Sequence, residues 1–169
     1  HGDLSDWDVS NVERMESMFF KAVSFNSDIS SWNVSNVTNM QSMFREASSF
    51  NADISDWEVS KVTNMARMFR EASSFNQDLS TWDVSQVTDM GGVFHNASEF
   101  NQNLGDWDIT SVEILSDPPF GFLRGTNLSI ANYDSLLIKW SQKNLPSNLT
   151  MDVDSPYSSR QAVSIFLFF

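Results

Sequence analysis

A tryptophan recurs at every twenty-fifth position over most of this 169-residue chain. The residues around it recur at the same interval, with apolar side chains in fixed places from Asp3 to Val112. A period of this length indicates a small structural unit that cannot bury its own apolar face, so that successive units must stack on one another. The repeating tryptophans are Trp7, Trp32, Trp57, Trp82 and Trp107.

Two elements are predicted in each unit. Apolar residues between Val37 and Ala47 recur at steps of three and four, which places them on one face of a helix. The rest of the unit is rich in turn formers, and we expect a short strand near Ile54 between tight bends. The sequence therefore predicts an α/β solenoid of 25-residue coils, each a helix plus a short strand. A residue suited to cap the helix precedes it in every unit: Ser10, Ser35, Ser60, Ser85 and Thr110.

The repeat pattern breaks after Leu115, where two prolines and a glycine interrupt the register. Helical spacing returns over 133–143 with Asn132 as the expected cap, and a second helix is expected to start near Ser158 or Ser159. We therefore expect a solenoid of about four and a half repeats over 1–115 and a non-repeating C-terminal helical cap over 116–169. The chain begins with His rather than Met, so we expect a fragment or a processed product.

Charge and composition exclude several classes of function. The chain carries 22 acidic and 10 basic residues, a net charge of -12, which disfavours binding to nucleic acid or to an anionic membrane surface. It contains no cysteine and two histidines, which leaves few ligands for a metal and no thiol nucleophile. No apolar run is long enough to cross a bilayer. We expect no enzyme activity, no cofactor, no metal and no membrane insertion within this segment.

One recurring phrase also carries a family resemblance. Residues 50–65, Phe-Asn-Ala-Asp-Ile-Ser-Asp-Trp-Glu-Val-Ser-Lys-Val-Thr-Asn-Met, followed by Met68 and Phe69, resemble the BspA-like leucine-rich-repeat surface proteins in the branch with 25-residue units. The resemblance implies a leucine-rich-repeat-type α/β solenoid, an extracellular or cell-surface location, and adhesion or protein binding. It supplies no catalytic motif. It also implies that the capping segment over 116–169 is truncated, since the closing segment of such proteins continues further.

An aspartate column is the most prominent candidate site. In stacked coils its members would lie about 4.8 Å apart, where neighbouring carboxylates repel by roughly 1 kcal/mol even in water. Asn103 occupies the fifth position, so the column tolerates an acceptor without charge. We interpret the column as turn-forming hydrogen-bond acceptors, with a calcium site as the alternative. Its acidic members are Asp3, Asp28, Asp53 and Asp78.

Two further columns are predicted to be structural ladders. An asparagine follows a phenylalanine at each bend, where its side chain can satisfy turn backbone; contact with a glycan is the alternative. The tryptophans are expected to pack in or beside the core, with a sugar-binding aromatic strip as the alternative. The column that contains His95 varies in residue type and is predicted to face solvent. The asparagines are Asn26, Asn51, Asn76 and Asn101.

The predicted partner-binding strip flanks the expected strand and is rich in carboxylates and hydroxyls. Repeat proteins commonly bind partners along such an extended face, and a basic or hydroxyl-rich surface would complement this one. The leading hypothesis is therefore a cell-surface or secreted adhesion module for a protein or glycan. The alternative is a structural unit that associates with neighbouring copies through the apolar end, residues 165–169. The strip consists of Asp6, Ser31, Asp56, Thr81 and Asp106.

Overall fold

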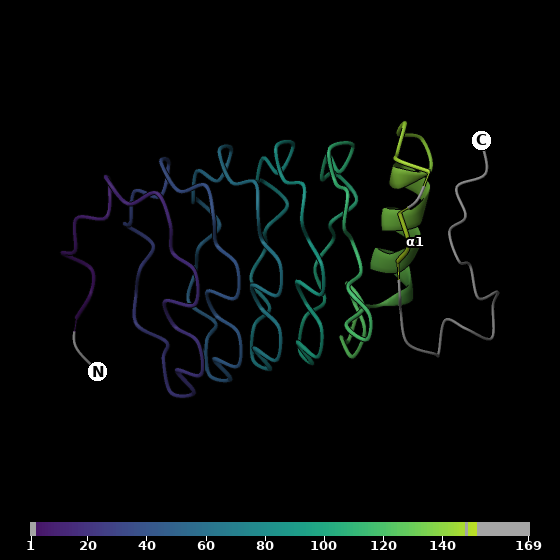
Figure 1. Ribbon diagram of the computed structural model, residues 1–169. Helices are drawn as coiled ribbons and strands as arrows, with labels where there is room; N and C mark the ends of the chain where they lie inside the picture. The colour runs from purple at the N-terminus through teal and green to yellow at the C-terminus, as the bar shows by residue number, and fades with distance from the viewer. Residues whose placement is uncertain (1–2, 148, 152–169) are drawn as a thin grey trace.

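A computed structural model describes residues 3–147 and 149–151. The chain winds through successive coils that lie side by side along one axis, with the first coil at one end and helix α1 at the other (Figure 1). Isolated parallel bridges join each coil to the next at one position per coil: Arg14, Asn39, Asn64, Asp89 and Ile114. We number the coils by their residues: coil 1 is 3–27, coil 2 is 28–52, coil 3 is 53–77, coil 4 is 78–102 and coil 5 is 103–128.

Alternate backbone N–H groups connect the coils. In coil 2 the N–H groups of Met40, Ser42 and Phe44 donate to carbonyls of coil 3 at 2.9 Å each. The residues between them close tight turns within their own coil, as when Met43 N–H donates to the Met40 carbonyl at 3.1 Å. In this segment one edge of each coil therefore presents donors, and the opposite edge presents acceptors.

The predicted α/β solenoid of helix-plus-strand coils is wrong. In the described residues the only helix is α1, which lies outside the coils, and the bridges between coils do not extend into continuous strands. A helix cannot form over residues 37–47 because Ser42 and Glu46 have φ of 56° and 61°, whereas an α-helix requires about −63°. The expected strand near Ile54 is instead a tight turn, in which Trp57 N–H donates to the Ile54 carbonyl at 3.2 Å.

The residues predicted as helix caps have a different role. Ser35 donates its backbone N–H to the side chain of Asn33 at 3.1 Å, and Ser85 donates to Asp83 at 3.0 Å. These are turns closed by an Asx side chain two residues earlier, and no helix follows them in the coils.

The core is a set of stacked columns along the axis. Phe44 stacks on Phe69 with ring centroids 5.7 Å apart and on Phe50 of its own coil at 3.8 Å. Both phenylalanine columns are fully buried in coils 2–4, as are the valine and methionine columns beside them. Since each coil contributes the same side chains, every interface between coils buries nearly the same apolar surface.

The last coil departs from the register and meets α1. Phe94 N–H donates to the Phe122 carbonyl at 3.1 Å, four residues later than the 25-residue period requires, because the segment 116–120 forms a separate turn. Helix α1, Ile130–Trp140, begins at the cap Ser129 and not at Asn132, and its buried side chains are Tyr133, Leu136 and Trp140. The second helix expected near Ser158 lies outside the described residues.

No helix in the described part of the chain is long and apolar enough to span a membrane.

Candidate functional site

The aspartate column lies at one edge of the stack and closes a turn in every coil. Asp28 accepts the Ser30 backbone N–H at 2.9 Å and its hydroxyl at 2.7 Å. In coil 5 Asn103 accepts the Gly105 N–H at 3.0 Å in the same geometry. The remaining members of the column, Asp3, Asp53 and Asp78, accept the N–H of the serine two residues later at 2.9–3.0 Å.

These hydrogen bonds favour the ionised form of Asp28 and of Asp53. The backbone and hydroxyl of Ser55 lower the pKa of Asp53, while the like charge of Asp28 acts in the opposite direction. The pKa of Asp28 is lowered in the same way by Ser30 despite the charge of Asp3. Hydrogen bonding therefore outweighs repulsion between neighbouring carboxylates.

A second column of Asx turns lies beside the first. Hydrogen bonds from the side chain and backbone of Ser85 lower the pKa of Asp83, and those of Ser10 lower the pKa of Asp8. The sequence analysis did not predict these turns. The available signal was an aspartate or asparagine two residues before a serine or threonine, as in Asp108 and Thr110.

All five residues of the predicted partner-binding strip are exposed, but they are not equivalent. The hydroxyls of Ser31 and Thr81 donate to backbone carbonyls of the preceding coil at 3.0 Å each. Asp106 binds Lys139 of α1, with both carboxylate oxygens 2.7 Å from Nζ. Among the described residues Asp6 and Asp56 have no hydrogen-bond partner, so their carboxylates can bind another molecule.

Three carboxylates meet at an open hollow between coils 3 and 4. Asp56 and Thr81 of the predicted strip line it together with Glu58 and Asp83. All four side chains are exposed. We call residues 3–8 and their equivalents 28–33, 53–58, 78–83 and 103–108 the acidic edge. Its acids are Asp3, Asp6, Asp8, Asp28, Asp53, Asp56, Glu58, Asp78, Asp83, Asp106 and Asp108.

The asparagine column forms a continuous ladder that ends on α1. Asn76 accepts the backbone N–H of Asn101 at 2.8 Å, and Asn101 in turn accepts the N–H of the α1 cap Ser129 at 2.8 Å. Asn132 then donates to the side chain of Asn101 at 3.0 Å, as Gln102 does to Asn76 at 2.9 Å. Asn26 and Asn51 make the same bonds earlier in the stack.

The tryptophan column also connects neighbouring coils. The Trp57 indole N–H donates to the Ile29 carbonyl of the preceding coil at 3.2 Å, and its ring stacks on Trp32 at 6.5 Å. Trp32, Trp82 and Trp107 make equivalent bonds and are buried. Trp7 in coil 1 is 53% exposed, so only this end of the column presents an aromatic ring to solvent.

The column that contains His95 was predicted to face solvent, and this prediction is wrong for His95 itself. His95 is buried because Phe120, from the turn over 116–120 in coil 5, folds over it with ring centroids 5.3 Å apart. The Arg70 guanidinium lies 3.8 Å from the centroid of the same ring. The contacts of His95 and Arg70 with Phe120 therefore hold this turn against the stack.

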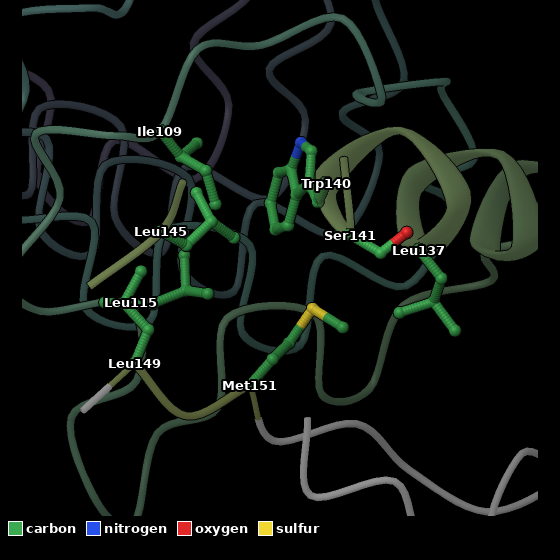
Figure 2. Close-up of a pocket in the computed structure, with 8 residues that line it drawn as sticks. All are labelled: Ile109, Leu115, Leu137, Trp140, Ser141, Leu145, Leu149 and Met151. Carbon is green, nitrogen blue, oxygen red and sulfur yellow. The ribbon is translucent and has the colours of Figure 1, made fainter. Parts of the chain in front are cut away.

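An apolar cavity of about 30 Å³ lies where coil 5 meets α1 (Figure 2). Figure 2 shows Ile109 and Leu115 of the coil facing Trp140 of the helix, with Leu145, Leu149 and Met151 closing the sides. Its apolar lining identifies it as a packing void. The apolar segment 165–169, predicted to mediate self-association, lies outside the described residues.

Within residues 3–147 and 149–151, no three histidine or acidic side chains converge in a way that could hold a metal ion. The carboxylates of the aspartate column point to their own turns and not to a common centre. What the acidic edge can do chemically is present fixed negative charge at regular spacing.

The fold and this edge define a class of protein: stacked 25-residue coils with one edge that is acidic and repetitive. Residues 1–62 and 30–133 match the family described as "Mycoplasma protein of unknown function, DUF285". The chain belongs to this family. The two overlapping matches are what an internal repeat produces, since the same motif aligns in more than one register. No curated protein and no solved structure matches the chain.

Proposed function

We propose that this chain is a non-catalytic binding module whose acidic edge holds a basic protein surface outside the cell or at its surface. The observation that carries the proposal is the hollow between coils 3 and 4, where the free carboxylate of Asp56 stands beside Glu58 and Asp83. Lysine and arginine side chains complement such fixed carboxylates. Because the turn with Ser85 holds Asp83 in place, this carboxylate can bind a cation without rearranging.

The resemblance to BspA-like surface proteins supports the location and the adhesive role in this proposal. It rests on the repeated phrase around Trp57 and does not depend on a helix in each unit. A glycan rich in amines would satisfy the same carboxylates, but the four buried tryptophans offer no exposed ring for stacking on a sugar.

The test separates the acidic edge from net charge alone. The edge variant combines Asp56→Asn, Glu58→Gln and Asp83→Asn, which preserves the acceptor that closes the turn at Ser85. The control variant combines Glu99→Gln, Glu113→Gln and Asp134→Asn, three exposed acids away from the edge. Both variants lose three negative charges. Binding to a lysine-rich peptide is measured at two salt concentrations by calorimetry.

We expect the edge variant to bind at least about tenfold more weakly than the control variant, a difference of about 1.4 kcal/mol. We also expect binding to weaken with salt. Equal loss in both variants would show that only the total charge attracts the peptide, and the proposal would then be wrong.

A further inference from the structure

The outward face of coil 1, which we call the open face, differs from every other interface in the stack. Trp7 is 53% exposed and Met18 is 39% exposed, whereas their equivalents Trp32 and Met43 are 3% and 0% exposed. Val23 is also exposed at this end of the molecule. The tryptophan and methionine side chains that elsewhere pack against a neighbouring coil therefore meet solvent here.

The open face also carries backbone groups arranged for a further coil. In coil 2 the carbonyls of Asn39, Gln41, Met43 and Arg45 accept N–H groups from coil 1 at 2.9–3.0 Å. The equivalent carbonyls of residues 14, 16, 18 and 20 accept nothing from the described residues. These four acceptors all lie on the same side of the segment, because its alternate N–H groups point into coil 2.

Three donors complete this pattern. The N–H groups of Thr38 and Ser49 donate to carbonyls of coil 1, and that of Asn51 donates to the side chain of Asn26. The equivalent N–H groups belong to Glu13, Ser24 and Asn26, and within the described residues they have no acceptor. Donors and acceptors thus recur on the open face in the register used between the other coils.

The far end of the stack cannot supply the partner. Coil 5 and α1 cover the donor side of coil 4, and Asn132 of α1 binds Asn101 where a further coil would do so. Of the surfaces formed by the described residues, a second copy could therefore present only its own open face. The carbonyls of residues 14, 16, 18 and 20 would then meet carbonyls.

We infer that the open face docks one further coil of the same 25-residue type, whose alternate N–H groups donate to the carbonyls of residues 14, 16, 18 and 20. The three interfaces among coils 1–4, each with four alternate hydrogen bonds, give the pattern that such a partner must have. This surface is the end of the stack and is independent of the acidic edge.

The probe is a synthetic peptide with the sequence of residues 28–52, added to the intact protein. Amide hydrogen exchange is followed by NMR at Glu13, Ser24 and Asn26. We expect exchange at these three amides to slow by at least about tenfold, since each gains an acceptor. A peptide of the same composition in permuted order should leave them unchanged.

Two matched variants test whether the peptide binds at the open face. Met18→Lys puts a charge on the open face and should abolish the protection, whereas Ile138→Lys makes the same kind of change on an exposed position of α1 and should preserve it. The inference is overturned if the peptide protects none of the three amides, or if it protects them equally in both variants. It is also overturned if sedimentation shows that the protein alone dimerises and protects these amides without peptide, because the occupant would then be a second copy.

Discussion

Each aspartate of the repeating column makes hydrogen bonds that an asparagine can also make, as Asn103 shows in coil 5. We therefore expect Asp53→Asn to change stability little, whereas Asp53→Ala should cost about 1 kcal/mol through loss of the bonds from Ser55. The cost is modest because Asp53 is exposed and water can replace the lost acceptor. Thermal melts of both variants and the wild type, with and without EDTA, measure this. A large effect of EDTA, or equal damage in both variants, would show that the column binds a cation.

The same carboxylates make stability depend on pH. Their pKa is lower in the folded protein than in the unfolded chain, because the folded state donates hydrogen bonds to the charged form of Asp28 and Asp53. Stabilisation is therefore complete above the ordinary carboxyl pKa of about 3.9 and is lost as the pH falls through the lower folded-state value. We expect a nearly constant melting temperature between neutral pH and about pH 5, and a fall below about pH 4. A melting temperature that rises on acidification would contradict this.

At the scale of one coil, the tryptophans have unequal roles despite identical sequence context. Trp57→Phe removes the indole donor from the buried bond to the Ile29 carbonyl and should destabilise the protein by about 1–3 kcal/mol. Trp7→Phe removes a ring that is half exposed and makes no such bond in the described structure, and should cost less than about 0.5 kcal/mol. Urea unfolding of the two variants measures the difference. Equal losses would show that the indole bond between coils contributes nothing.

The helix predicted in each coil is wrong because consecutive tight turns place apolar residues at nearly the same spacing as a helix does. Val34, Val37, Met40 and Met43 follow one another at steps of three, and two of these steps are the first and last residues of tight turns closed by a hydrogen bond. A helix averages 3.6 residues per turn, so an unbroken run of threes was the available signal against it. The left-handed residues could not have been predicted, since Ser42, Glu46 and Arg67 are not residue types that favour positive φ.

At the scale of the whole molecule, the repeat period specified which residues share a column, and the charge pattern specified an acidic edge. The sequence could not show which residues of the partner-binding strip are bound within the protein and which are free, because this depends on contacts between distant segments. Lys139 of α1 neutralises Asp106 from 33 residues away. The turn at Ser85 holds Asp83 at the hollow between coils 3 and 4, which Asp56 also lines.

The described repeat units stack by hydrogen bonds between coils and contain no helix. Couplings across hydrogen bonds, measured by NMR between amide nitrogens and carbonyl carbons, test it most directly. We predict couplings from Met40 to Asn64, from Ser42 to Ala66 and from Phe44 to Met68, each spanning 24 residues. Couplings from these amides to carbonyls four residues earlier in the same unit would mean that the segment is an α-helix, and would contradict the account.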